Sequence, residues 1–321
     1  METTRPGLRK TKIDLRNMEN NFVHSAKNFM KLIAGIIFLL FSDKVISQDS
    51  MAAHYRIYDT RAKQIITLDK IVSDCADADV LFFGEEHNDS ACHYMEVEIF
   101  KALHQKFGEN IALSLEMFET DNQIALNDYL AGFIPEDRFS KDVRLWNNYK
   151  DYRPMVEYAK QNHINVIAAN PPRRYVSMVS RRGMKSLDSL SKDSKKFLPP
   201  IPYYTLTGRY REKFMDIMKG SPGSSSPTIY YSQNLWDAGM SYSLYKFWRK
   251  NKSKKIFHCV GRFHCDEKLG TLAQLQNRKS KLKILNISSF SDATFPDPDW
   301  STFSNLGDYI ILTDPGLKKT F

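Results

Sequence analysis

The chain has 321 residues and a formal net charge of +9, but the charge is not spread evenly along it. Residues 1–47 contain eight Lys and Arg against four Asp and Glu, which leaves about +5 on the remaining 274 residues. So modest an excess argues against a nucleic-acid-binding protein. Residues 48–321 are long enough to bury a sizeable core, and they predict one large domain or one domain with an insertion.

An apolar run of ten residues, 32–41, directly follows Lys31. The run is too short to span a bilayer, which takes about 20 residues, and it is typical of the core of a secretory signal peptide. Residues 45–47 offer a cleavage site before Gln48, so we expect an exported protein of the periplasm or the membrane-associated cell envelope. An uncleaved anchor is the alternative. No cysteine closely follows the run, which argues against a lipoprotein anchor.

The rest of the chain alternates between strand-like and helix-like stretches. A hairpin at 54–67 and a short helix at 68–75 are expected before the first buried strand, 79–83. A helix follows at 90–107, with Ser90 as its expected N-cap and Gly108 at its end. The next expected elements are strand 111–115, helix 121–131, helix 152–162 and strand 164–169. This β-α-β-α order predicts an α/β fold with a largely parallel sheet flanked by helices.

Residues 172–250 interrupt this rhythm. Helix-like stretches and one brief strand-like run are expected there: helices at 173–182, 206–219 and 231–250, and the strand-like run at 228–231. We expect this segment to form a helical lid over the strand ends. Its tyrosines and arginines could surround a flat ligand that carries carboxylates. The sheet is expected to resume with strands at 255–260, 282–288 and 308–313.

Two short motifs share the pattern Gly-x-x-His, and each follows a strand-like run: residues 84–87 and residues 261–264. Glycine lets the chain turn sharply where a strand ends, and the histidine can then project from the loop. Glu116 and Asn170 end two further strand-like runs. Ligands of open α/β sheets bind beyond the carboxyl ends of the strands. We therefore expect five polar side chains at one edge of the sheet: Glu85, His87, Glu116, Asn170 and His264.

Such a cluster of carboxylates and imidazoles suits a metal ion, a general acid–base pair or polar contacts to a ligand. A single Gly-x-x-His motif is a weak signal, because a histidine after a strand is more often a loop or capping residue. Four polar strand ends in one chain favour a functional cluster over that simpler interpretation.

Four cysteines lie in the predicted domain, at positions 75, 92, 259 and 265. They form no Cys-x-x-Cys pair, so no structural zinc site is predicted. An exported protein could oxidise its cysteines, and Cys92 and Cys265 could approach each other if the two motif loops meet. The simpler interpretation is that they are small residues of the loops or core.

Six motifs occur in an order that resembles a known family. They are residues 84–89 with His93 beyond them, residues 115–118, Trp146 with residues 151–154, residues 170–173, residues 232–240 and residues 261–264. In this order they resemble the ChaN-like haem-binding uptake proteins, within the wider Tiki/TraB and erythromycin-esterase-like superfamily. The resemblance covers most of residues 78–312.

The resemblance implies an exported protein that binds haem, or a similar iron-bearing ligand, between the strand ends and the lid. An outer-membrane uptake system is the implied partner, and a homodimer is the implied assembly. The implied ligand-binding residues are Glu85, His87, His93, Glu116, Asn170, Trp236, Asp237 and His264. The chain departs from the family pattern at Arg262 in the last motif, and at Cys92, where a histidine is frequent. These departures leave the axial ligand open.

A metal-dependent hydrolase, of protease or esterase type, is the alternative that related branches of the superfamily suggest. Glu85, His87, Glu116 and His264 could hold one divalent ion and leave a position for water, which the ion would make nucleophilic near neutral pH. Glu85 and His87 would then be the catalytic residues, or His87 alone the general base. The sequence has no Gly-x-Ser-x-Gly nucleophile elbow, which argues against a serine hydrolase. A structural or partner-binding protein is the third hypothesis.

Overall fold

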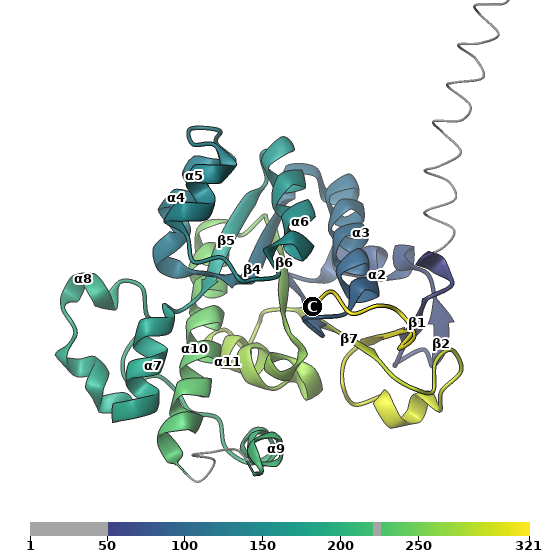
Figure 1. Cartoon of the computed structure of the whole chain (residues 1–321). Helices are drawn as coiled ribbons and strands as arrows, with labels where there is room; N and C mark the ends of the chain where they lie inside the picture. Colours follow the sequence, from purple (N-terminus) through teal and green to yellow (C-terminus); the bar gives the residue numbers. More distant parts are fainter. Residues whose placement is uncertain (1–50, 221–225) are drawn as a thin grey trace, which may run out of the picture. The chain divides into compact units, whose positions relative to one another are not determined.

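The computed structural model describes residues 51–220 and 226–321, and residues 54–321 form one compact unit (Figure 1). An eight-stranded sheet runs through this unit in the order β2-β1-β8-β7-β3-β6-β4-β5. The strands are β1 (Tyr55–Asp59), β2 (Gln64–Ile66), β3 (Val80–Glu85), β4 (Ile111–Glu119), β5 (Asn165–Asn170), β6 (Lys255–Gly261), β7 (Ile284–Ser291) and β8 (Tyr309–Thr313). The predicted leader, residues 1–47, lies outside the described residues. Within the described ranges, none of the helices combines the length and apolar character needed to cross a membrane.

Six of the strands, from β8 through β5 in the sheet order, run parallel, and the β1–β2 hairpin adds two antiparallel strands at one edge. The predicted α/β class with a largely parallel sheet is therefore confirmed, as is the edge hairpin. Strands β3 and β4 end later than predicted, at Glu85 and Glu119. These extensions bring the motif carboxylates Glu85 and Glu116 into the sheet itself.

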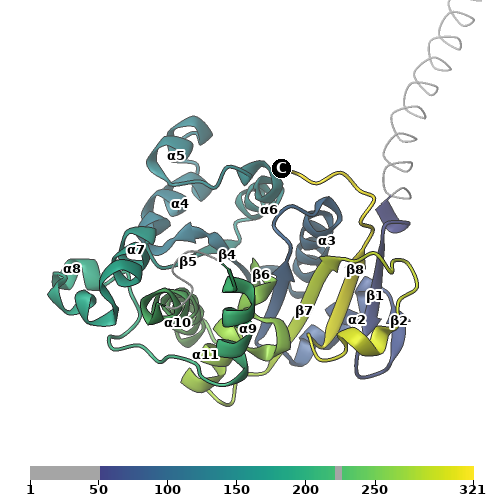
Figure 2. The ribbon, with the colours of Figure 1, turned by 60° about the horizontal axis from the view of Figure 1, so that its bottom comes forward.

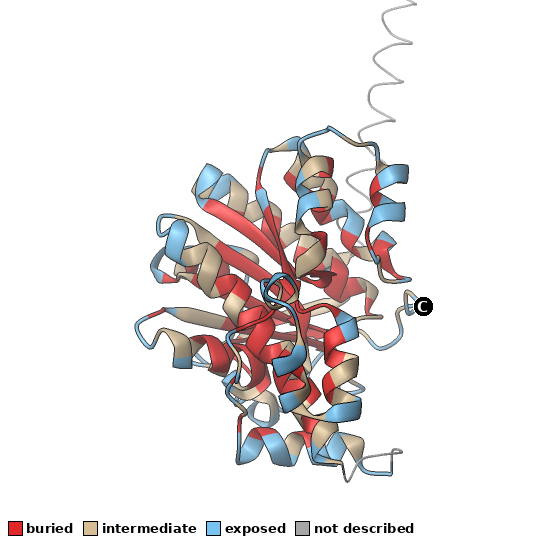
Figure 3. Ribbon diagram, turned by 90° about the vertical axis from the view of Figure 1, so that its left-hand side faces the viewer, coloured by how far each residue is buried: buried red, intermediate tan, exposed pale blue. Residues whose placement is uncertain are grey.

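Helices cover both faces of the sheet (Figures 1 and 2). They are α2 (Leu68–Asp74), α3 (Ser90–Phe107), α4 (Gln123–Leu130), α5 (Glu136–Asp142), α6 (Tyr149–Gln161), α7 (Arg173–Arg182), α8 (Lys192–Lys195), α9 (Arg209–Met218), α10 (Pro227–Lys250) and α11 (Gly270–Arg278). Successive residues of β3 point to opposite faces. Leu81 and Phe83 belong to the core under α3 and α6, whereas Val80 and Phe82 belong to the core under α10 and α11. The sheet is thus buried between two helical layers (Figure 3).

Helix α3 spans the residues predicted for it, but its N-cap is Asp89 rather than Ser90. The Asp89 side chain accepts hydrogen bonds from the backbone N–H groups of Ala91 and Cys92, at 2.9 and 3.0 Å. A carboxylate at this position also interacts favourably with the helix dipole, which a serine hydroxyl does only weakly. The cap fixes the start of the helix that carries the buried His93 towards the sheet.

The segment 172–250 contains helices α7 to α10, with a non-helical stretch at 198–208. The strand-like run expected at 228–231 is wrong, because these residues form the first turns of α10. Pro227 occupies the start of the helix, where the missing N–H of proline costs little. Tyr230 packs with α9 in a small core, so tertiary contacts override the β propensity of the run. Further along α10, Met240 and Leu244 pack on the sheet. That the segment acts as a lid stays a prediction.

The four cysteines, all in the described part of the chain, are free and buried. Burial raises the pKa of the Cys75 thiol to about 12 and raises those of Cys92, Cys259 and Cys265 well above the ordinary value. Thiols held neutral in this way are unreactive packing groups. The simpler interpretation of the cysteines is therefore the one that the structure supports.

Candidate functional site

The two Gly-x-x-His motifs lie on neighbouring strands. Strand β3 pairs in parallel with β6, and the register places Glu85 opposite Gly261. On its other side β6 pairs with β4, with Leu115 opposite Cys259. Because parallel strands present their carboxyl ends at the same edge, Glu116 follows at the level of the second motif. Segments far apart in the sequence therefore meet at one edge of the sheet.

The glycines of the two motifs are required by close packing rather than by an unusual backbone. A Cβ atom at Gly84 would lie 2.5 Å from the Cys265 Sγ and 3.0 Å from the Arg262 Cα, both in the loop after β6. A Cβ atom at Gly261 would lie 2.8 Å from the His87 Nε2. Each motif glycine thus makes room for the other motif, so that the two loops fit against each other.

Glu116 stabilises the turn at the end of β6 through a hydrogen bond. Its Oε2 accepts a hydrogen bond of 2.7 Å from the backbone N–H of Gly261. Its other oxygen, Oε1, lies 3.8 Å from the His264 Nε2. The carboxylate is largely buried, so both contacts act in a region of low dielectric constant. Glu116 therefore sets the position of the second motif and faces its histidine.

The ring of His264 is fixed by a hydrogen bond to Asp237, a fully buried residue of α10. The His264 Nδ1–H donates to the Asp237 Oδ1 at 2.7 Å. The same carboxylate accepts hydrogen bonds from the hydroxyls of Thr271 and Tyr210. A carboxylate bonded to one ring nitrogen fixes the tautomer and orients the other nitrogen, as in many metal-binding histidines. The Nε2 of His264 is therefore the nitrogen turned to the cleft.

The charge of the His264 ring depends on these carboxylates. Burial by itself would lower the pKa of His264, but the negative charges of Asp237 and Glu116 outweigh that effect and raise the pKa above its ordinary value. The ring is thus a good partner for an anion or, after loss of the Nε2 proton, a basic ligand for a metal.

A cleft of about 750 Å³ opens beside this histidine. Residues from both helical layers and from the strand ends line it: Glu116, Glu119, Arg144, Leu145, Trp146, Asn147, Asn148, Asn170, Pro171, Arg173, Arg174, Trp236 and His264. The volume falls within the range of about 300–1,000 Å³ that is usual for small-molecule and cofactor sites. A hollow of about 470 Å³ beside Pro200 and Arg278 contains none of the motif residues, so we place the candidate site in the cleft.

The rim of the cleft carries three arginines, Arg144, Arg173 and Arg174, all exposed. Arg144 lies 2.7 Å from the Glu119 carboxylate and also contacts Asp121. Arg174 contacts the second oxygen of Asp121. These acids fix the direction of two guanidinium groups while leaving N–H donors for an anionic ligand.

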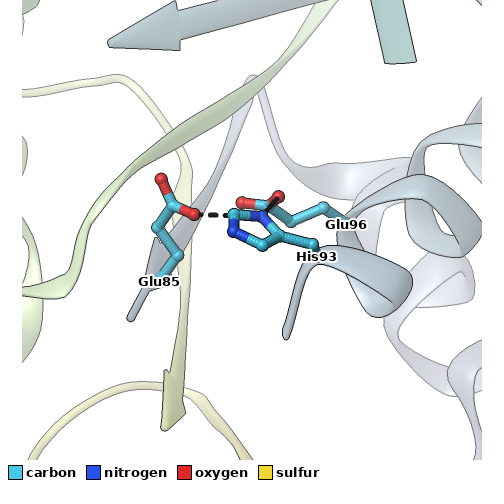
Figure 4. A group of neighbouring side chains, drawn as sticks. All are labelled: Glu85, His93 and Glu96. Carbon is cyan, nitrogen blue, oxygen red and sulfur yellow. Dashed lines mark hydrogen bonds and ion pairs between the residues drawn. The ribbon is translucent and has the colours of Figure 1, made fainter. Parts of the chain in front are cut away.

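A second group of polar side chains lies on the other face of the sheet, towards α3 and α6. The Glu85 Oε1 accepts hydrogen bonds from the Tyr152 hydroxyl at 2.7 Å and from the His87 Nδ1 at 3.0 Å. The Glu85 Oε2 lies 3.4 Å from the His93 Nδ1, which also lies 2.9 Å from the Glu96 Oε2 (Figure 4). Glu85, His93 and Glu96 are 2%, 5% and 0% exposed. This group is sealed from solvent.

The sealed group contains two carboxylates that cannot both be charged without a cation. Burial and the neighbouring Glu85 raise the pKa of Glu96 far above its usual range. Burial would lower the pKa of His93, but the carboxylates of Glu96 and Glu85 raise it to about 10. His93 is therefore protonated at neutral pH in the absence of any other cation.

The structure divides the residues predicted from the sequence between these two groups. Four of them line the cleft: Glu116, Asn170, Trp236 and His264. His87 lies between the groups. Its side chain is 39% exposed, and its ring packs in a T-shaped arrangement against Trp146, with the ring centroids 5.2 Å apart. Glu85 and His93 belong to the sealed group. Asp237 is hydrogen-bonded to His264 but does not line the cleft.

The metal set predicted from the sequence does not gather around one point. Among the described residues, the group of three whose ligand atoms all lie within 4.8 Å of one another is Glu85, His93 and Glu96. It differs from the predicted set, in which His87, Glu116 and His264 accompanied Glu85. The reason is the alternation of side chains along strands, which sends Glu85 to the α3 face and Glu116 to the α10 face.

Glu96 was missed in the sequence, although one signal pointed to it. His93 and Glu96 are three residues apart on α3, so their side chains lie on the same face of the helix. Tyr152, which contacts Glu85, sits within a motif but carries no local sign of its role. Arg144 and Thr271 reach the site from distant segments, and nothing in their sequence neighbourhoods predicts it.

The fold and the cleft define an α/β protein whose candidate site lies beyond the carboxyl ends of parallel strands. The chain belongs to the family described as haem-binding uptake, Tiki superfamily, ChaN, whose model matches residues 71–275. The family resemblance of the ordered motifs is thereby confirmed.

A solved structure of a known protein shares the fold. ChaN of Campylobacter jejuni, described as showing cofacial heme binding, has a TM-score of 0.62 and 18% identity over 81% of this chain and 97% of that chain. At this identity the likeness shows the fold alone. A mutant of erythromycin esterase EreC in its open conformation has a TM-score of 0.43 and 12% identity over 81% of this chain and 83% of that chain, too distant to carry an argument.

A curated relative matches only in part. Protein RETICULATA-RELATED 5, chloroplastic, from Arabidopsis thaliana, is 26% identical over 111 residues, which are 33% of this chain. The match spans 15% of that protein's own length.

Proposed function

We propose that the protein binds haem in the cleft beside His264 and serves the uptake of haem or of the iron that it carries. One observation carries the proposal: the Nε2 of His264 faces the cleft while its Nδ1–H is bonded to the buried Asp237 at 2.7 Å. Histidine is a common axial ligand of haem iron, and a carboxylate behind the ring makes it a more basic one.

The walls and the rim of the cleft suit the two parts of a haem molecule. Trp146, Trp236 and Pro171 offer apolar surface for a flat macrocycle. Arg144 and Arg173 at the rim offer N–H donors to the two propionate carboxylates, in the geometry that guanidinium groups prefer. Haem would be the cargo of the protein, and its iron would bind the protein ligand on loading and leave it on release.

The family and the ChaN structure support this proposal. We further propose that residues 1–47 direct export to the periplasm or the cell envelope and that an outer-membrane uptake system is the partner. Residues 172–250 would act as the lid, and two chains would pair around the ligand. The N-terminus of protein recovered from cells tests the first point, since cleavage before Gln48 is expected and an intact Met1 would contradict it.

A haem titration followed by absorbance tests the main proposal. The purified protein is expected to give a saturable Soret band with a fixed number of haems per chain. In His264→Ala the affinity should fall about 100-fold or more, because the iron loses its protein ligand. The control is His104→Ala, which removes an imidazole of α3 that is hydrogen-bonded to Tyr158 of α6. Equal binding by the wild type and His264→Ala would overturn the assignment of the ligand, and no Soret band in the wild type would overturn the function.

A further inference from the structure

Three ligand-type side chains meet between the end of β3 and the first turns of α3 (Figure 4). Their donor atoms lie within 4.8 Å of one another, and all three residues are buried. We propose that Glu85, His93 and Glu96 form a closed site for one divalent transition-metal ion, separate from the cleft proposed for haem. The proposal does not depend on haem binding.

The hydrogen bonds of His93 leave its Nδ1 as the atom that faces this site. The His93 Nε2–H donates to the backbone carbonyl of His87 at 3.0 Å, which fixes the ring. A neutral imidazole with its proton on Nε2 presents a lone pair at Nδ1. That lone pair points at carboxylate oxygens of Glu96 and Glu85, at 2.9 and 3.4 Å. Three acceptors directed at one point need either a proton on the ring or a metal ion between them.

Two carboxylate oxygens of the site lack hydrogen bonds. Within the described part of the chain, the Glu85 Oε2 and the Glu96 Oε1 are buried and have no hydrogen-bond partner. Such orphans are rare in folded proteins and call for an explanation, such as an ion. A proton on the His93 Nδ1 serves the Glu96 Oε2 at 2.9 Å and leaves the Glu85 Oε2 without a hydrogen bond. A metal ion serves the imidazole and both carboxylates together.

Charge and surroundings also fit a metal ion. Two carboxylates and a neutral imidazole carry a charge of −2, which one divalent ion balances in a site that excludes water. The groups around the three ligands are held as in known metal sites: Tyr152 and His87 donate to the Glu85 Oε1, and the His87 carbonyl holds His93. The ligands are thus oriented before any ion binds.

The donor set indicates the class of ion. An imidazole nitrogen with carboxylate oxygens suits Zn²⁺, Fe²⁺ or Mn²⁺, whereas Ca²⁺ and Mg²⁺ prefer oxygen ligands and retain water. Zn²⁺ is the first ion to test, with Co²⁺ as its coloured substitute.

Calorimetric titration of chelator-treated protein with Zn²⁺ tests the proposal. One Zn²⁺ per chain is expected, with affinity about 100-fold or more lower in Glu96→Gln, which keeps the size of the side chain and removes its charge. The control is Glu98→Gln, the same substitution on the same helix at a residue that pairs with Lys101. It should bind Zn²⁺ like the wild type.

The outcomes separate this site from the cleft. Zn²⁺ binding that survives in His264→Ala and is lost in Glu96→Gln supports the proposal, whereas the reverse places the ion in the cleft and overturns it. No saturable Zn²⁺ binding by the wild type also overturns it. If Glu96→Gln does not fold, X-ray absorption of the wild-type Zn²⁺ complex decides, since one imidazole and two carboxylates are expected as ligands. Haem titration of Glu96→Gln, expected to match the wild type, keeps the two proposals distinguishable.

Discussion

Two groups of side chains, the cleft group (Glu116, Asp237 and His264) and the sealed group (Glu85, His93 and Glu96), are built from the same residue types at the same edge of the sheet. Their surroundings differ. In the cleft, His264 is backed by Asp237 and turns its Nε2 to a space of about 750 Å³. In the sealed group, His93 lies between Glu85 and Glu96, and the three residues are at most 5% exposed. An imidazole that has open space beside its second nitrogen can exchange a large ligand. An imidazole enclosed by two carboxylates can hold only a proton or a small ion.

The two groups are joined through His87. Its Nδ1 donates to Glu85 in the sealed group, and its ring lies against Trp146 on the wall of the cleft. Its side chain is 39% exposed, so it marks the boundary between the closed and the open region. Burial would lower the pKa of His87, but the Glu85 carboxylate raises it to about 9. His87 therefore carries a positive charge beside the cleft at neutral pH.

The largest expected effect is on the stability of the sealed group. His93→Asn removes the cation from between two buried carboxylates, which should lower the free energy of unfolding of metal-free protein by about 3–5 kcal/mol. Urea unfolding at pH 7 measures the change. His104→Asn, at the last turn of the same helix, should cost about 1 kcal/mol or less. Similar costs for the two variants would show that the sealed group is not a coupled ionic cluster.

The second-largest effect is expected on haem affinity, when the side chain that supports His264 in the cleft group is changed. Asp237→Asn keeps the shape of the side chain but removes the charge behind His264, so haem affinity should fall about 10–100-fold. A haem titration checks this value, and Zn²⁺ binding by the sealed group should not change. An Asp237→Asn variant with wild-type haem affinity would mean that His264 is not the ligand or does not need this support.

A further imidazole, that of His258, is fully buried in the core. Burial lowers its pKa to about 3, and its Nδ1 is 3.0 Å from the Ser114 Oγ. Above about pH 6.5 the ring is neutral in both the folded and the unfolded chain, so it adds no pH dependence. Below that pH the unfolded chain takes up a proton that the folded chain refuses until about pH 3. Stability is therefore lost as the pH falls through this window.

His258→Leu should remove this contribution. Between pH 6 and pH 4 the free energy of unfolding of the wild type should fall more steeply than that of the variant, by about 1.4 kcal/mol per pH unit. Denaturant unfolding at several pH values gives both slopes. Parallel slopes would show that His258 is protonated in the folded protein.

The smallest effect is expected at the rim of the cleft. Arg144 is exposed and pairs with Glu119 and Asp121 at the surface, so Arg144→Gln should change the free energy of unfolding by about 1 kcal/mol or less. Haem affinity should fall only a few-fold, and more at low salt than at high salt, because the lost interaction is screened. A change in affinity that does not depend on salt would mean that Arg144 acts by packing alone.

The sequence predicted much of the fold because its hydrophobic patterns are strong. Strand order could not be predicted from one sequence, but the adjacency of the two Gly-x-x-His motifs followed from the rule that ligands bind at carboxyl ends of parallel strands. Helix α3 was placed correctly, whereas its cap fell one residue earlier, at Asp89. The strand assignment at 228–231 failed because packing on α9 overrides local propensity.

The predicted metal set differs from the observed arrangement of side chains at Glu85, where the face of a strand decides. The strand predicted at 79–83 ends before Glu85, so the sequence alone leaves the direction of the Glu85 side chain undetermined. The prediction therefore places Glu85 beside Glu116. In the structure β3 continues through Glu85, and the alternation of side chains fixes it on the face of α3. Contacts from distant segments, such as that of Thr271 with Asp237, leave no pattern in a single sequence.

A crystal structure of the haem complex would decide whether the cleft is the haem site. The iron is expected to be coordinated by the Nε2 of His264, with the macrocycle between Trp146 and Trp236 and the propionates at the arginine rim. Haem bound elsewhere on the chain, or coordinated by another residue while His264 keeps its contact with Glu116, would contradict the proposal.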